Sequence, residues 1–160
     1  MRKRKEYLDE RQQIERGKAF RNAFFTMAIA LLICCTINSL LTERIFNDSE
    51  IMMITIWLSL SVYYTTVIIR DALFINNKEN YSGLWMTLAI CYLTVGIAEL
   101  WLFVSFMQIQ TSDEVGLLGK LFEKAVLGVS MIEVGVVYFV KRIRDRSKAK
   151  AAEEPEKIAE

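Results

Sequence analysis

The chain has 160 residues, of which 53% are hydrophobic and 24% are charged, and its net charge is +1. The charged residues gather outside long apolar runs, and Glu99 and Glu133 are the two that we assign to the membrane interior. This segregation excludes an ordinary soluble domain, which would scatter its charges at helix or strand spacing. The one proline, Pro155, lies in the tail, so the apolar runs favour α-helix.

The first 21 residues form a charged arm that is rich in good helix formers. Lys5 with Asp9, and Arg11 with Glu15, are oppositely charged pairs at i,i+4 spacing. We expect the arm, residues 1–21, to be a cytoplasmic helix that continues into the first membrane span.

Four apolar runs follow, and each has about the length that a helix needs to cross a bilayer. They predict an all-α, polytopic membrane four-helix bundle over 22–140, with spans at about 22–41, 51–69, 84–107 and 122–140. The second and fourth spans are the shortest, and the fourth contains Glu133. The segment just before it could lie in the membrane interface or lengthen the fourth helix.

The distribution of Lys and Arg predicts the orientation. With the N-terminus inside, 17 of the 20 basic residues lie on the inner side, and the reverse topology would place them outside. We therefore expect both termini to be cytoplasmic. The tail, 141–160, is basic at first and then polar, and we expect it to be frayed or disordered after Arg146.

The two intramembrane glutamates are the sharpest candidates for function. Spans three and four are antiparallel and joined by a short loop, so we expect them to be neighbours with Glu99 and Glu133 at similar depth on facing helices. Two such carboxyls could form a proton or cation site. The alternative is that each glutamate hydrogen-bonds hydroxyl groups and only holds helices together. We count Lys120 and Lys124 with the loop before span four, so we expect no basic partner for either glutamate within the spans.

A polar helix face is also predicted from i,i+4 and i,i+3 spacing along span two, with a further hydroxyl in span three. Small and hydroxylic residues of this kind either pack helices together or line a solvated pathway. The residues are Thr55, Ser59, Tyr63, Thr66 and Thr94.

Basic residues flank the membrane domain at both ends and could bind anionic lipid head groups. The alternative is that they only set the topology. The candidates are Arg2, Lys3, Arg4, Lys5, Lys141, Arg142 and Arg144. We expect no nucleic-acid partner, because both basic segments adjoin the membrane.

Several chemistries have no support in the sequence. Histidine, the commonest general base and metal ligand, does not occur. The three cysteines lie in apolar runs and are interpreted as small packing residues. Phosphate-binding, hydrolase and metalloprotease motifs do not occur either. We therefore expect no catalytic residues, metal or cofactor, and no enzyme activity.

The segment YLDERQ, from Tyr7 to Gln12, precedes a charged helix and several spans. This arrangement resembles small, uncharacterised membrane proteins of Gram-positive bacteria that carry a DERQ-like arm before their first span. Members are often encoded beside a helix-turn-helix regulator or a transporter. The resemblance implies a bacterial inner membrane, and it lends no catalytic residues.

Two functions follow as hypotheses. The first is a small accessory or regulatory subunit that binds through helix packing and its cytoplasmic arm, as a homo-oligomer or with another membrane protein. The alternative is a small proton- or cation-coupled transporter that uses Glu99 and Glu133. Membrane lipids are expected partners in both cases.

Overall fold

Each long apolar run of the sequence lies within an α-helix in a computed structural model of the chain. The structure describes residues 10–41, 44–70, 72, 82–109 and 115–158. The four helices are α1 (Glu10–Leu40), α2 (Asp48–Ile69), α3 (Ser82–Ile109) and α4 (Val115–Ile158). For the residues that the structure describes, the prediction of an all-helical fold with four helices is confirmed.

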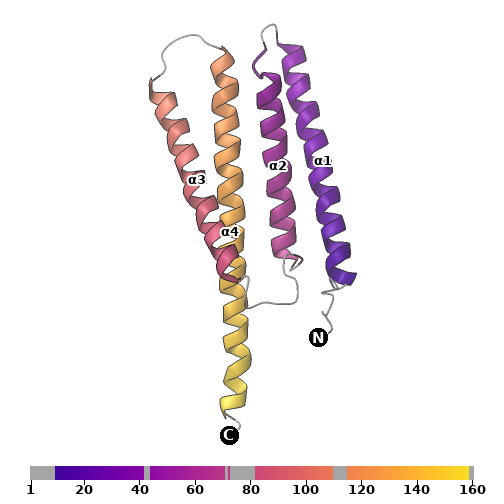
Figure 1. Cartoon of the computed structure of the whole chain (residues 1–160), viewed down its shortest axis with the longest axis vertical. Helices are drawn as coiled ribbons and strands as arrows, with labels where there is room; N and C mark the ends of the chain where they lie inside the picture. The colour runs from indigo at the N-terminus through magenta and orange to yellow at the C-terminus, as the bar shows by residue number, and fades with distance from the viewer. Residues whose placement is uncertain (1–9, 42–43, 71, 73–81, 110–114, 159–160) are drawn as a thin grey trace, which may run out of the picture.

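The helices lie side by side in one open layer, in the order α1, α2, α4, α3 (Figure 1). Among the described residues α2 packs against α1 and α4, and α3 packs mainly against α4. We call the end of the layer where α4 begins the upper end, and the opposite end the lower end, as drawn in Figure 1. α1 begins at the lower end, and α4 extends beyond the other helices there before it ends.

Small residues determine how closely α1 approaches α2. The buried residues of α1 are Ala19, Ala23, Ala30 and Cys34, and their spacing places them along one helix face. Helices in a membrane approach each other through such faces, because short side chains let the backbones come close. Ala19 is fully buried against Val67 and Ala72 at the lower end.

Glycines have the same role between α3 and α4. A Cβ atom added at Gly96 would lie 2.9 Å from the carbonyl oxygen of Gly128, and one added at Gly128 would lie 3.0 Å from that of Gly96. Gly135 similarly faces Leu93, whose Cγ would lie 2.6 Å from an added Cβ. The two backbones are therefore in contact where these glycines meet, and a larger residue would push the helices apart.

At the upper end, side chains bond to the backbone of Phe46 and Asn47, the two residues before α2. The Asn38 amide donates to the carbonyl of Phe46 at 2.8 Å and accepts from its N–H at 3.1 Å. The N–H of Asn47 donates to Glu50 Oε2 at 2.9 Å, which caps the start of α2. Phe46 makes an edge-on ring contact with Phe122 of α4, at 5.6 Å between centroids.

Three helices are long and apolar enough to cross a membrane: α1, α2 and residues Trp85–Ser105 of α3. Large hydrophobic side chains are exposed on all four helices, as expected of a surface that contacts lipid. The apolar stretch of α4, residues 125–140, is shorter, lies between Lys124 and Lys141, and contains Glu133.

The helices extend beyond the predicted spans. Residues 10–21 of the arm are helical and continuous with the first span, whereas residues 1–9 lie outside the described part of the chain. The expectation of a frayed or disordered tail after Arg146 is wrong, because α4 continues to Ile158. Alanine, glutamate and lysine dominate this segment, and their high helix propensity explains the continuation.

Candidate functional site

The first predicted carboxylate, Glu99, forms an ion pair at the upper end of the layer. Lys124 Nζ lies 3.0 Å from Glu99 Oε2, and the Glu99 side chain is 19% exposed. The expectation that no basic residue could pair with Glu99 is therefore wrong. Lys124 lies at the edge of the predicted span 122–140 and is counted there with the preceding loop, whereas α4 begins nine residues earlier at Val115 and presents Lys124 to α3.

The second carboxylate, Glu133, faces α2. Ser61 Oγ donates to Glu133 Oε2 at 2.6 Å, and Thr65 Oγ1 is 3.3 Å from Glu133 Oε1. Ser61 and Thr65 are one turn apart on α2, so their hydroxyls meet the two oxygens of one carboxyl group. Ser61 is buried, but Glu133 itself is exposed on the surface of the layer.

The structure does not bring the two glutamates together. Glu99 binds Lys124, which is nine residues before Glu133 on α4. Nine residues correspond to about 14 Å along a helix and about half a turn around it. The predicted pairing of Glu99 and Glu133 at similar depth is therefore wrong, although α3 and α4 are neighbours as expected.

Glu133 lies at the centre of the apolar stretch of α4, where a charge is expensive. Its position is eight residues after Ala125 and seven before Val140. A charged side chain at the centre of a membrane helix costs on the order of 3 kcal/mol. A hydrogen bond between membrane helices contributes about 0.6 kcal/mol on average. The bonds from Ser61 and Thr65 therefore offset only part of the cost.

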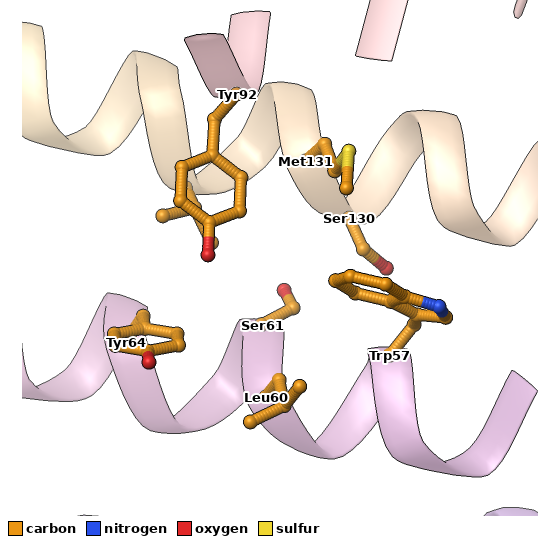
Figure 2. Close-up of a pocket in the computed structure, with 8 residues that line it drawn as sticks. Trp57, Leu60, Ser61, Tyr64, Tyr92, Ser130 and Met131 are labelled. Atoms are coloured by element: carbon orange, nitrogen blue, oxygen red, sulfur yellow. The ribbon is translucent and has the colours of Figure 1, made fainter. Parts of the chain in front are cut away.

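A small pocket lies where α2, α3 and α4 meet (Figure 2). Tyr92 of α3 reaches toward Tyr64 of α2, and their ring centroids are 6.5 Å apart. The cavity volume is about 10 Å³, which is room for one water molecule and excludes a larger ligand. Glu133 is not among the residues that line this pocket, although Ser61, which donates to its carboxyl, is one of them.

One polar atom beside this pocket lacks a partner. The indole Nε1 of Trp57 is buried and has no acceptor within the part of the chain that the structure describes. In Figure 2 the nitrogen lies on the edge of the ring that faces away from Tyr92.

The predicted polar face does not form a shared site. Four of its hydroxyls donate to carbonyls of their own helix: Thr55 to Met52, Ser59 to Ile56, Thr66 to Val62 and Thr94 to Cys91. Tyr63 packs against the buried cluster of Ala19, Val67 and Ala72. These contacts satisfy the hydroxyls locally, which is the behaviour of packing residues.

At the lower end, α1 is attached to the end of α2 by charged side chains. Glu15 binds Lys18 at 2.8 Å and also forms an ion pair with Arg70. These two cations hold the pKa of Glu15 below its ordinary value of 4.5. Arg16 Nε donates to the carbonyl of Ala72 at 2.7 Å. The arm is thus fixed to α2 along residues 15–19.

The structure describes three of the seven residues that were predicted to contact lipid head groups. Arg2, Lys3, Arg4 and Lys5 lie outside the described residues. On α4, Lys141 is 3.5 Å from Asp145, and Arg142 donates to the Tyr138 hydroxyl at 3.3 Å. Arg144 is exposed.

Sequence reasoning missed a buried carboxylate at the upper end. Glu50 is 3% exposed and binds the backbone and side-chain nitrogens of Asn47. The signal was available, because Asn followed three residues later by Glu is a helix-start pattern. A Cβ atom at Gly119 would collide with Glu50 Oε2 and with the carbonyl of Ile45, so α4 can approach this cap only through glycine.

Comparisons of the chain with protein-family models, with curated proteins and with solved structures found no match. The resemblance to small membrane proteins of Gram-positive bacteria therefore stays a prediction.

Proposed function

We propose that the chain is a non-enzymatic membrane subunit that binds another membrane protein through the open face of its helix layer. The observation that carries this proposal is Glu133, a carboxyl exposed at the centre of an apolar helix. Two hydroxyl bonds offset only part of the cost of placing it in lipid. A neighbouring protein that covers this face would remove the carboxyl from the hydrocarbon.

The proposal includes four membrane spans with both termini in the cytoplasm. Three helices meet the length and hydropathy of a span, and α4 packs between two of them in the layer. α1 begins and α4 ends at the lower end, and the proposed topology makes that end cytoplasmic. It places 17 of the 20 Lys and Arg residues inside, in accordance with the positive-inside rule. The proposed location is the inner membrane of a bacterium.

Native mass spectrometry of the full chain, extracted from its own membrane in mild detergent, tests the proposal. We expect a complex of fixed stoichiometry that contains a second membrane protein. Recovery of the chain alone across several mild detergents, with wild-type stability, would contradict the accessory function.

Lipid head groups are proposed as further partners of the basic residues at the lower end. Arg144 is exposed, and Lys141 and Arg142 lie within one turn of it. Replacing all three by Gln should weaken sedimentation with vesicles of anionic lipid but not with zwitterionic vesicles, and the loss should be largest at low salt. If the wild type and the triple variant sediment equally with anionic vesicles, these residues do not bind lipid head groups and only set the topology.

A second candidate function is proton- or cation-coupled transport, and the hydroxyl-bonded carboxyl of Glu133 favours it. The single layer encloses no pathway among the described residues, so transport would need a second copy. A proteoliposome flux assay separates the two functions. A pH-driven flux in the wild type that disappears in Glu133→Gln would establish transport. The absence of flux in the wild type would reject the transport hypothesis.

A further inference from the structure

We propose that the exposed face of α4 around Glu133 binds a membrane helix that carries Lys or Arg near the centre of the bilayer. The inference rests on the proposed function, lateral binding of another membrane protein, and specifies the chemistry of the partner. It follows from the side chains that surround Glu133 on the surface of α4 and from where the basic residues of the chain lie.

The face is a continuous apolar stripe interrupted by one carboxyl. Val129 and Val136 flank Glu133 at one turn on either side and are 57% and 45% exposed. The stripe continues at helical spacing toward both ends of α4, so a straight partner helix could follow it. Its exposed apolar residues are Leu118, Phe122, Val129, Val136, Val140 and Ile143.

The hydrogen bonds of Glu133 come from neutral groups and bring no positive charge to the carboxylate. Ser61 and Thr65 are neutral donors, and both approach from α2, on one side of the carboxyl. In the part of the chain that the structure describes, no ion pair involves Glu133. Glu133 is an exposed residue, and a carboxylate in hydrocarbon is complementary to a cationic donor on a neighbouring helix.

A second copy of this chain fits the face poorly. The nearest described basic residue before Glu133 on α4 is Lys124, which is half a turn around the helix and paired with Glu99. A copy packed in parallel against the stripe would therefore set carboxylate against carboxylate. It would also set the basic segment from Lys141 to Arg146 against itself. Charge complementarity thus favours a different protein.

A direct test uses the full chain and defined probes. The chain, carrying a fluorescent donor, is reconstituted into zwitterionic vesicles with leucine-rich membrane-spanning peptides that carry an acceptor. The peptides differ at one central position, which is Lys, Leu or Glu. Energy transfer should show binding of the Lys peptide about tenfold tighter than of the Leu peptide, because a hydrogen bond between two charged groups is roughly twice as strong as a neutral one. The Glu peptide should not be preferred.

Three variants separate this face from other parts of the layer. Glu133→Gln should abolish the preference for the Lys peptide. Val136→Trp keeps the carboxyl but obstructs the stripe, so it should weaken binding of the Lys peptide. This variant tests the same face independently of any effect of Glu133→Gln on folding. Glu99→Gln, whose carboxylate is paired within the chain, should keep the preference. A thermal unfolding measurement accompanies each variant.

Several outcomes would overturn the inference. Equal binding of the Lys and Leu peptides by the wild type would do so. Energy transfer between copies of the chain that Glu133→Gln abolishes would assign the face to a second copy instead. If native mass spectrometry finds a membrane partner that Glu133→Gln retains in full, the accessory function stands and this face is not its binding surface. Binding of the Lys peptide without any native partner would reject the accessory function alone.

Discussion

Lys124 Nζ lies 3.0 Å from Oε2 of Glu99, and this ion pair joins α4 to α3 at the upper end of the layer. Lys124 is 37% exposed and Glu99 is 19% exposed, so the pair is partly shielded from its surroundings. Removing one partner leaves the other charge uncompensated beside apolar side chains.

We expect Glu99→Gln and Lys124→Met each to lower the free energy of unfolding by about 1 kcal/mol. The double variant should lose less than the sum of the two, because no charge is left unpaired. Thermal unfolding in detergent micelles measures this. Lys120→Met, which removes an exposed lysine one turn earlier, is the matched control and should be close to neutral. Strict additivity of the two substitutions would show that the ion pair contributes nothing.

Gly119 and Gly17 provide a contrasting pair of helix glycines. An added Cβ at Gly119 collides with Glu50 Oε2, whereas nothing lies within 4 Å of one added at Gly17. Gly119→Ala should destabilise the chain by about 1 to 3 kcal/mol through overpacking. Gly17→Ala should stabilise it by about 0.5 to 1 kcal/mol, because alanine is the better helix former. Similar melting temperatures for both variants would argue against the close approach of α4 to Glu50.

Much of the fold could be predicted because each helix can be recognised from the length of its own apolar run and from the charged residues at its ends. The four helices follow from that information alone. The partners of the two glutamates could not be predicted, because they depend on which helices are neighbours. α2 lies beside α4, so Ser61 and Thr65 meet Glu133. Lys124 lies at the edge of the fourth apolar run and was counted with the loop before it, so its contact with Glu99 was missed.

The proposed topology can be tested by labelling single cysteines from outside the cell. Asn47 lies at the upper end of the layer and Ser147 on the extension of α4 beyond the lower end, and both are exposed. A membrane-impermeant maleimide should label Asn47→Cys in intact cells and Ser147→Cys only after permeabilisation. The wild type, whose own cysteines lie within α1 and α3, is the background control. Labelling of Ser147→Cys in intact cells would reverse the orientation.

The last prediction concerns the attachment of the arm to α2 and its dependence on pH. Lys18 and Arg70 lower the pKa of Glu15 below 4.5, so the folded chain binds a proton at this site less readily than the unfolded chain does. The stabilisation is therefore fully present above about pH 4.5 and is lost as the pH falls through the lowered pKa. Glu15→Gln cannot titrate, and every other carboxyl is common to both proteins. The difference in melting temperature between the wild type and Glu15→Gln should be constant from about pH 5 to 8. It should shrink below that range.

Salt provides an independent check on the origin of that difference. Lys18 and Arg70 are 44% and 46% exposed, so solvent ions reach the ion pairs of Glu15. At about 1 M salt the Debye length falls to about 3 Å, and the advantage of the wild type at neutral pH should decrease. Arg70→Met should reduce the advantage of the wild type over Glu15→Gln, because Glu15 loses one of its two cations and keeps only its ion pair with Lys18. An advantage that persists unchanged at pH 3 and in high salt would mean that Glu15 stabilises the arm through packing rather than through its charge.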